Sequence, residues 1–219
     1  MRISLQAVLA TLISALIQFG IAIALWGGPA AFFAHRAFIV LAAVTLAMMA
    51  VAPLSQGNLN PGQQEDRSNR WVLLAFSLIA LGTAILPAYC DRHGILTLDG
   101  DATRWAGVAL YTAGGVLRLW PVFVLGKRFS GLVAIQEGHT LETGNIYRYV
   151  RNPSYLGMVV ILVGWALVFR SLLGLVFSLL LWVPLGFRIA AEERLLRAHF
   201  GAEYETYCAR TPRLIPWLW

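Results

Sequence analysis

Six long runs of apolar residues, separated by shorter polar segments, dominate the pattern of this chain. They cover residues 5–26, 37–54, 71–90, 105–125, 154–169 and 171–189. As helices, these runs cross or nearly cross a hydrocarbon core about 30 Å thick. The pattern therefore predicts an all-α, polytopic integral membrane protein with about six transmembrane helices. Because only Arg170-Ser171 separates the last two runs, we expect them to form a C-terminal helical hairpin.

The composition supports a membrane protein. Hydrophobic residues make up 58% of the 219 residues and charged residues only 13%, which is more apolar surface than one soluble core buries. The net charge of +6 suggests nucleic acid as a partner, but the basic residues are scattered in loops between the apolar runs. We therefore expect the bilayer as partner and no nucleic acid. The first run is longer than the apolar part of a usual signal peptide, so we expect it to be a span.

The distribution of basic residues predicts the orientation, because cytoplasmic loops carry an excess of arginine and lysine. With the N-terminus in the cytoplasm, four basic residues lie outside, namely Arg36, Arg92, Arg104 and Arg170. Twelve lie inside, namely Arg2, Arg67, Arg70, Lys127, Arg128, Arg148, Arg151, Arg188, Arg194, Arg197, Arg210 and Arg213. We expect both termini and the polar tracts 126–153 and 188–219 to be cytoplasmic. Segment 55–70 is expected to be a flexible loop, and the aspartate-bearing segment 91–104 to face outward.

Histidine and cysteine show no metal-binding pattern. No His-Glu-x-x-His motif is present, and the histidines are isolated at positions 35, 93, 139 and 199. We expect no metal. Cys90 and Cys208 fall on opposite sides of the predicted membrane, so we expect no disulfide. The chain also lacks a glycine-rich turn between strand and helix, which excludes a soluble Rossmann-type domain.

A polar tract, Arg151-Asn152-Pro153-Ser154-Tyr155, stands where a loop enters the fifth apolar run. Proline in the first helical turn costs no hydrogen bond, so the tract predicts a helix start whose free N–H groups can face a ligand. Local physics alone favours a simpler interpretation, in which Arg151 reaches the lipid headgroups and Asn152-Pro153 caps the helix. His139, thirteen residues before Asn152, is in isolation more typical of a solvated loop residue than of a catalyst.

Arg188 and Glu192 lie four residues apart at the inner end of the sixth run. On a continuing helix they share one face, and an intrahelical ion pair in an interfacial helix explains them simply. That explanation does not account for two adjacent carboxylates, Glu192 and Glu193, beside the membrane, where each costs solvation unless it has a partner.

Taken together, these motifs resemble the isoprenylcysteine carboxyl methyltransferase family and the related phospholipid methyltransferases. The matching pieces are His139-Thr140-Leu141, Tyr147, Arg151 through Gly157, Glu192-Glu193, Phe200 through Tyr204, Tyr207 and Thr211 through Pro216. The match of the whole set favours a ligand site over isolated helix ends. The first four runs match only as apolar segments.

The resemblance implies an S-adenosyl-L-methionine-dependent methyltransferase with cytoplasmic cofactor-binding loops. Its cofactor-binding residues would be Gln136, His139, Thr140, Leu141, Glu142, Tyr147, Asn152, Pro153, Ser154, Tyr155 and Glu192. Arg188 would bind the acceptor, and Arg188 and Arg151 would be the catalytic residues. Asn152 replaces the family's usual histidine, which excludes a titrating imidazole there. Glu142 replaces an apolar residue. Residues 1–125 would be a four-span membrane region, and residues 126–219 the catalytic region.

The predicted activity is carboxyl O-methylation of an isoprenylcysteine-like or other lipophilic acceptor. N-methylation of a phospholipid such as phosphatidylethanolamine is the alternative within the same class, although an amine needs a base, for which Glu193, His139 and Tyr204 are candidates. A transporter or structural membrane protein is the alternative of another class. Arg118, inside the fourth run, favours it, although Arg118 would equally line an acceptor tunnel. The acceptor and the oligomeric state stay open, and Gly107, Gly114 and Gly115 would permit close helix packing.

Overall fold

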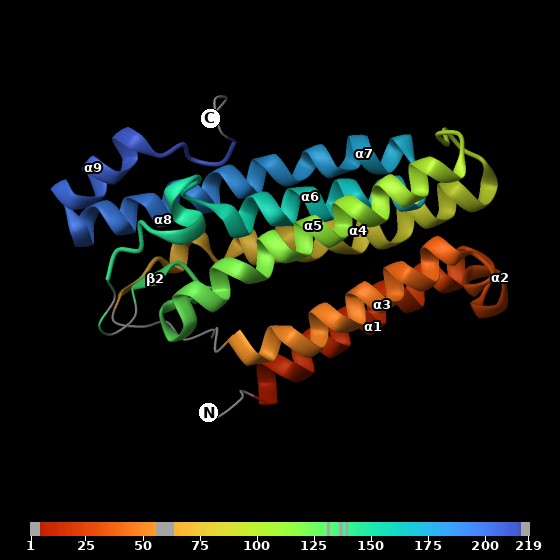
Figure 1. Ribbon diagram of the computed structural model, residues 1–219, viewed down its shortest axis with the longest axis horizontal. Helices are drawn as coiled ribbons and strands as arrows, with labels where there is room; N and C mark the ends of the chain where they lie inside the picture. The colour runs from red at the N-terminus through yellow and green to blue at the C-terminus, as the bar shows by residue number, and fades with distance from the viewer. Residues whose placement is uncertain (1–4, 56–63, 131, 136–137, 139, 216–219) are drawn as a thin grey trace.

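The computed structural model describes the chain apart from residues 1–4, 56–63, 131, 136–137, 139 and 216–219. The described part is almost entirely helical (Figure 1). Its α-helices are α1 (Leu5–Leu25), α2 (Pro29–Phe33), α3 (Arg36–Val51), α4 (Trp71–His93), α5 (Asp101–Leu125), α6 (Pro153–Val168), α7 (Leu172–Ser178), α8 (Trp182–Phe200) and α9 (Ala202–Arg210). Short 3₁₀ turns are η1 (Ala52–Ser55), η2 (Arg67–Asn69), η3 (Gly126–Arg128), η4 (Asn145–Arg148) and η5 (Leu179–Leu181).

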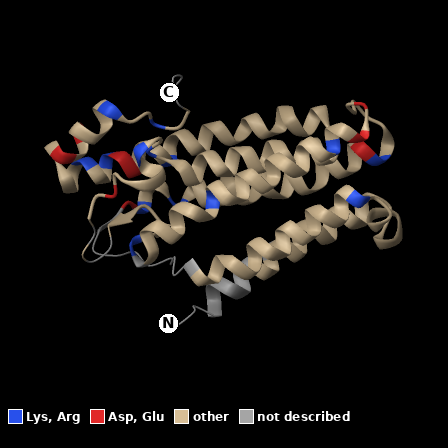
Figure 2. Ribbon diagram, in the orientation of Figure 1, with Lys and Arg blue, Asp and Glu red and all other residues tan. Residues whose placement is uncertain are grey.

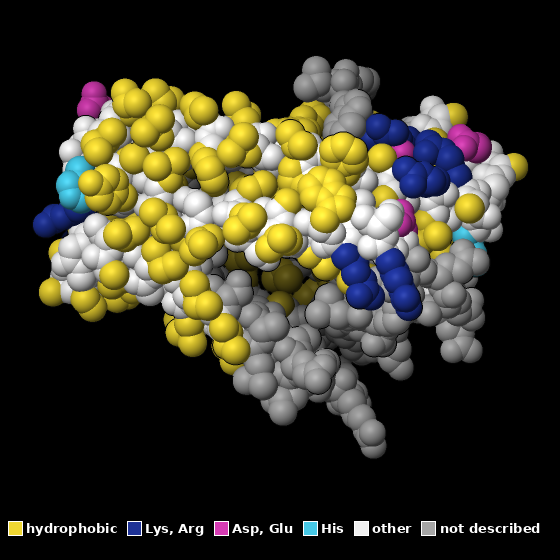
Figure 3. Space-filling model, turned by 180° about the vertical axis from the view of Figure 1, so that it is seen from behind, with side chains coloured by type: hydrophobic (Ala, Val, Ile, Leu, Met, Phe, Trp, Pro, Cys, Tyr) yellow, Lys and Arg dark blue, Asp and Glu magenta, His cyan; other side chains and the backbone are white. Residues whose placement is uncertain are grey.

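The helices follow the apolar runs. Among the described residues, four helical stretches are long and apolar enough to cross a membrane, namely Arg36–Leu54, Arg67–His93, Asp101–Leu125 and Leu172–Phe200. Shorter apolar helices cover Ala15–Leu25 and Pro153–Val168. Large apolar side chains on the outer faces are exposed, for example Leu16 at 70% and Leu46 at 65%. Hydrophobic side chains accordingly cover much of the surface (Figure 3), as expected for helices whose solvent is lipid.

Glycine brings α5 and α6 into close contact, and the two helices run side by side (Figure 1). A Cβ added to Gly114 would meet the backbone nitrogen of Ile161 at 2.6 Å, and one added to Gly157 would meet the backbone nitrogen of Arg118 at 2.5 Å. Gly107 packs in the same way on the backbone of α6. The close packing predicted for these glycines is therefore confirmed, and it occurs within the chain.

A buried charged cluster joins the helices at the end of the bundle where α4 passes into α5. The Asp91 carboxylate accepts hydrogen bonds from Trp26 Nε1 at 2.6 Å, from Arg104 Nη1 and Nη2 at 2.7 and 3.1 Å, and from Arg170 Nε at 3.0 Å. Arg104 also lies over the Phe38 ring at 4.9 Å. The segment 91–104 was expected to face outward. Asp91 and Arg104 within it are buried, because the helices extend further than the apolar runs.

The chain reverses between α6 and α7. Arg170 has a φ of 49°, its carbonyl accepts from Leu98 N at 2.7 Å, and Leu172 N donates to Leu96 O at 3.0 Å. At the other end of the molecule, β1 (Gln64–Glu65) pairs antiparallel with β2 (Ala134–Ile135). The expected loop 55–70 therefore contains η2 and a short strand, and its central part lies outside the described residues. The last apolar run does not end at residue 189, because α8 continues to Phe200.

Candidate functional site

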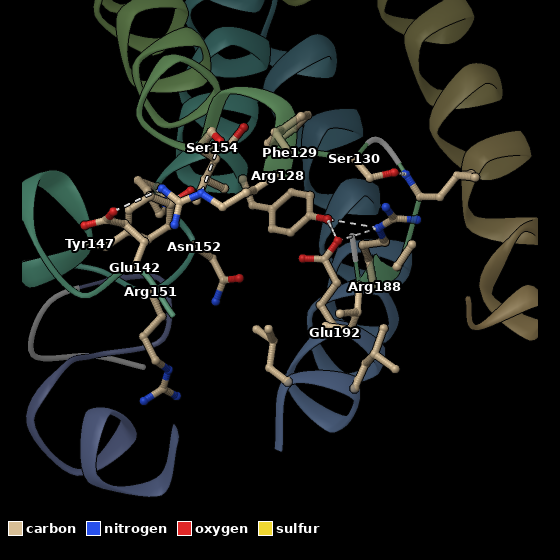
Figure 4. A pocket seen from close by; sticks show the side chains of 18 of the residues that line it. Arg128, Phe129, Ser130, Glu142, Tyr147, Arg151, Asn152, Ser154, Arg188 and Glu192 are labelled. Atoms are coloured by element: carbon tan, nitrogen blue, oxygen red, sulfur yellow. Dashed lines mark hydrogen bonds and ion pairs between the residues drawn. The ribbon is translucent and has the colours of Figure 1, made fainter. Parts of the chain in front are cut away.

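Charged residues gather at the end of the bundle formed by α8, α9 and β2 (Figure 2). A cavity of about 200 Å³ lies there. Its walls come from α4, α5, α6 and α8, from the segment after α5 and from α9. Figure 4 shows Glu192 and Arg188 on one side of this space, with Tyr147, Glu142 and Arg128 on the other. The folded chain thus brings both predicted polar tracts to one cavity.

Glu192, Arg188 and Tyr155 form a connected group in this cavity. Arg188 Nε donates to Glu192 Oε1 at 3.0 Å and to the Tyr155 hydroxyl oxygen at 2.9 Å. The Tyr155 hydroxyl donates in turn to Glu192 Oε1. Arg188 is almost fully buried, while the Glu192 side chain is 26% exposed and directs its carboxylate into the space opposite Asn152 (Figure 4). The group therefore presents a fixed carboxylate to whatever occupies the cavity.

Arg118 reaches the cavity from α5. Its Nη1 donates to Ser154 Oγ, and the Ser154 hydroxyl donates to the Arg118 carbonyl at 3.2 Å. No carboxylate of the described residues lies within ion-pair distance of this guanidinium. Because a cation is costly in a membrane helix unless an anion balances it, Arg118 is a candidate group for holding an anion in the cavity.

A loop and two tyrosines form the opposite wall. Arg128 Nη1 donates to Thr140 Oγ1 at 2.6 Å, and Arg128 Nη2 lies 3.4 Å from Glu142 Oε2. The Tyr207 hydroxyl donates to the Tyr147 carbonyl at 2.7 Å. Burial raises the pKa of both tyrosines above the usual value, so both stay protonated at neutral pH.

A second carboxylate cluster lies behind the cavity and is centred on Glu193, which is 1% exposed. Its Oε1 accepts from Arg151 Nε at 3.2 Å and from Arg213 Nε at 3.1 Å, and its Oε2 lies 3.5 Å from Arg197 Nη2. Arg151 Nη1 also donates to the Thr211 carbonyl at 2.7 Å. Arg151 lines the cavity, but its guanidinium is directed away from Glu192 (Figure 4).

The segment after α9 crosses the start of α6. Arg151 N donates to Pro212 O at 3.0 Å, while Asn152 N and Nδ2 donate to Arg213 O at 3.2 and 2.8 Å. The Asn152 side chain is thus anchored by its nitrogen to this segment. The side-chain oxygen Oδ1 of Asn152 can then accept a hydrogen bond from a ligand.

Most of the predicted site residues meet in this cavity, whose lining includes Leu141, Glu142, Tyr147, Arg151, Asn152, Pro153, Ser154, Tyr155, Arg188 and Glu192. Thr140 lies beside the wall and is bonded to Arg128. Gln136 and His139 lie outside the described residues. Sequence reasoning missed Arg128, Phe129 and Ser130 in the wall, and it did not assign Tyr204 and Tyr207 to it. A basic residue three positions after the end of an apolar run, as Arg128 is, was the available signal.

The described residues contain no group of three or more His, Cys, Asp or Glu side chains that could hold a metal ion. The chemistry available in the cavity comes from carboxylate, guanidinium, tyrosine and apolar groups. Such a set is suited to a ligand that carries both charge and apolar surface.

Comparisons with known proteins agree on one family. The family model for phospholipid methyltransferases matches residues 102–203. The chain is 41% identical over 110 residues to a protein-S-isoprenylcysteine O-methyltransferase of Schizosaccharomyces pombe, covering 47% of this chain and 45% of that protein. It is 32% identical over 117 residues to a probable protein-S-isoprenylcysteine O-methyltransferase of Oryza sativa subsp. indica, covering 52% of this chain and 61% of that protein. The matches thus span about half the length of these relatives.

A solved structure supports the same fold. The eukaryotic intramembrane Ras methyltransferase ICMT (isoprenylcysteine carboxyl methyltransferase) superposes with a TM-score of 0.58 and 21% sequence identity, covering 94% of this chain and 74% of that one. The predicted all-helical, polytopic architecture is therefore confirmed, and the chain is an integral multi-pass membrane protein. The family resemblance of the C-terminal motifs is confirmed as well. Over about half of its length the chain is similar to isoprenylcysteine carboxyl methyltransferases, and it shares their fold and a match to the phospholipid methyltransferase model.

Proposed function

We propose that this protein is a membrane carboxyl methyltransferase that transfers the methyl group of S-adenosyl-L-methionine to the carboxylate of an isoprenylcysteine-like, lipophilic acceptor. The observation that carries the proposal is the cavity in which the fixed carboxylate of Glu192 stands near two arginines, Arg118 and Arg188. The sequence similarity to protein-S-isoprenylcysteine O-methyltransferases supports it. The acceptor is identified only by its chemistry, an acid attached to an apolar chain.

The proposal includes the membrane arrangement. We infer six spans with both termini in the cytoplasm, a four-span region over residues 1–125, and a catalytic region over residues 126–219 that contains the hairpin of α6 with α7 and α8. The excess of arginine at the cavity's end of the molecule supports a cytoplasmic site (Figure 2). A hollow with hydrophobic side chains inside it opens near basic residues (Figure 3), which suits an acceptor arriving from the lipid.

The residues of the cavity fit the donor. Its ammonium and sulfonium groups are cationic, and Glu192 supplies a partly exposed carboxylate held by Tyr155 and Arg188. Leu141 and Tyr147 supply apolar and aromatic surface on the opposite wall. When bound, the donor supplies an electrophilic methyl group. The cofactor-binding role predicted for Glu192, Tyr147 and the start of α6 is retained as part of this proposal.

Arg118 and Arg188 would hold the acceptor carboxylate, so that one of its oxygens faces the methyl carbon. The new bond joins that oxygen to the methyl carbon as the methyl–sulfur bond breaks, and the electron pair of the broken bond stays on sulfur. No proton is lost, so no general base is needed. The reaction destroys charge, so apolar walls that exclude water favour it, and alignment of the groups is the protein's main task.

N-methylation of a lipid amine is less well supported by the same geometry, because an amine must first lose a proton. Glu193 is already paired with three arginines. Tyr204 is buried, and burial raises its pKa, so it stays protonated at neutral pH. His139, the third candidate base, lies outside the described residues. A purely structural or transport role does not explain why the carboxylate of Glu192 is held in the cavity.

The test compares wild type, Glu192→Gln and a matched control, Glu205→Gln, whose side chain is 59% exposed on α9 outside the cavity. Membranes are incubated with methyl-labelled S-adenosyl-L-methionine and a prenylcysteine acceptor, and base-labile volatile methanol is measured. We expect release with wild type and the control, and a loss with Glu192→Gln. Loss of hydrogen bonds to a charged group costs about 1.5–3 kcal/mol, or about 10- to 150-fold in donor affinity. Stable label in the lipid extract without methanol would move the assignment to N-methylation.

A further inference from the structure

The segment 140–144 forms one wall of the cavity, yet it belongs to no helix or strand. Leu141 and Glu142 line the cavity directly. A wall made of such a loop must be held by side chains, because otherwise a ligand would have to order it on binding, at a cost in affinity.

One arginine provides the support. Arg128 ends η3, directly after α5. Its Nε and Nη2 each donate to a carbonyl of the last turn of α5, those of Leu125 and Val124, both at 3.4 Å. Its Nη1 donates to Thr140 Oγ1 at 2.6 Å and to Thr140 O at 3.3 Å. A cation is favourable at a helix C-terminus, so α5 fixes the guanidinium that in turn holds the loop.

Glu142 completes the connection from the loop side. Its Oε2 lies 3.4 Å from Arg128 Nη2, while its Oε1 accepts from Gly144 N at 3.0 Å. The Arg128 and Glu142 side chains are 26% and 22% exposed, so water screens the pair only in part. The carboxylate thus fixes the internal turn of the loop and ties that turn to the end of α5 (Figure 4).

We propose that Arg128 and Glu142 are a positioning pair, which holds residues 140–144 in the conformation that binds the methyl donor and thereby sets donor affinity. The proposal rests on the proposed function, since it assigns the donor to this cavity. The pair acts on the loop and takes no part in methyl transfer. Its loss therefore raises the dissociation constant of the donor and changes kcat at saturating donor little.

The pairing itself can be separated from a direct contact of Glu142 with the donor by a double-mutant cycle of Arg128→Gln and Glu142→Gln. If the two residues act through each other, the effect of Glu142→Gln largely disappears once Arg128 is replaced. If Glu142 acts on the donor independently, the two effects multiply in the double variant, and the proposal is overturned.

The experiment titrates S-adenosylhomocysteine into the purified full-length protein in detergent micelles by calorimetry. We expect the dissociation constant to rise about threefold for Glu142→Gln and about tenfold for Arg128→Gln, because the second variant also loses the hydrogen bonds to Thr140. The double variant should equal Arg128→Gln. Glu205→Gln, which removes the exposed Arg197–Glu205 pair, is the matched control and should bind as wild type does. Thermal unfolding of each variant shows that the fold is retained.

Each outcome has a separate meaning. If the wild type fails to bind S-adenosylhomocysteine, the proposed function fails. If the wild type binds S-adenosylhomocysteine and both single variants bind it as tightly as the wild type does, only the proposal of the positioning pair is refuted. The methyl-transfer assay described above, run at saturating donor, supplies kcat. A kcat that falls in parallel with donor affinity would likewise refute a role restricted to the loop.

Discussion

The buried Asp91 cluster yields a prediction that is independent of the proposed activity. The carboxylate has no exposed surface and accepts hydrogen bonds from two arginines and from Trp26. Asp91→Asn keeps the shape but removes the charge, and its amide turns a donor toward groups that are themselves donors. Removing one partner of a buried ion pair costs about 3–5 kcal/mol. In a chain of this size, that corresponds to about 6–20 °C in Tm.

The cluster also predicts an order among variants. Arg104 is 5% exposed and bonds both Asp91 and the Val168 carbonyl, while Arg170 is 27% exposed and can return to water. We therefore expect the loss in Tm to decrease from Asp91→Asn to Arg104→Gln to Arg170→Gln. The cluster lies at the opposite end of the bundle from the cavity, so donor affinity of the folded protein should not change (Figure 2).

The assay is thermal unfolding of the purified protein in one detergent, followed by circular dichroism. Asp99→Asn, an exposed residue between α4 and α5, is the control and should shift Tm by about 1 °C or less. Equal Tm values for Asp91→Asn and Asp99→Asn would refute the reasoning. So would a larger loss for Arg170→Gln than for Arg104→Gln.

Three further predictions concern packing, the segment after α9 and pH. Gly114→Leu should prevent close approach of α5 and α6 and abolish the monodisperse peak in size-exclusion chromatography, whereas Gly186→Leu, at a position where a Cβ would meet nothing within 4 Å, should keep it. Glu193→Gln, which removes the carboxylate that pairs with Arg151, Arg197 and Arg213, should release the segment after α9 and speed its cleavage in limited proteolysis; an unchanged cleavage pattern would contradict the cluster's role. Burial raises the pKa of Tyr147 above its unfolded value of about 10, so its contribution to stability is complete below pH 10 and is lost as pH rises further. The fall in Tm above pH 10 should be smaller for Tyr147→Phe than for the wild type. An equal fall in both proteins would contradict the raised pKa of Tyr147.

Hydropathy predicts the helices of this chain because the bilayer imposes a simple rule on each segment, which must be apolar and hydrogen-bonded within itself. The rule fails at the helix ends. α8 continues past residue 189 to Phe200 because Arg188, Glu192 and Glu193 find partners in folded neighbours, a compensation that hydropathy cannot include.

The candidate site was predicted where residues are close in sequence and missed where they meet only after folding. The tract around Asn152 and the pair Arg188 and Glu192 carry local patterns. Arg128 does not, and it was missed. Arg118 was singled out as a charge inside a span, but its bond to Ser154 could not be predicted, because it depends on how closely α5 approaches α6 and therefore on glycines further along both helices. The role of each site residue stays a prediction until the variants above are measured.

The way in which the segment after α9 crosses the start of α6 has a consequence for biosynthesis. Arg151 and Asn152 are held by carbonyls that lie 60 and 61 residues later in the chain. At a synthesis rate of about 5–20 residues per second, those carbonyls follow about 3–12 s after the start of α6 has been made. α6 is therefore synthesised before the backbone that fixes its polar end exists. The cavity that these contacts border is therefore completed only after the hairpin of α6 with α7 and α8 has been synthesised.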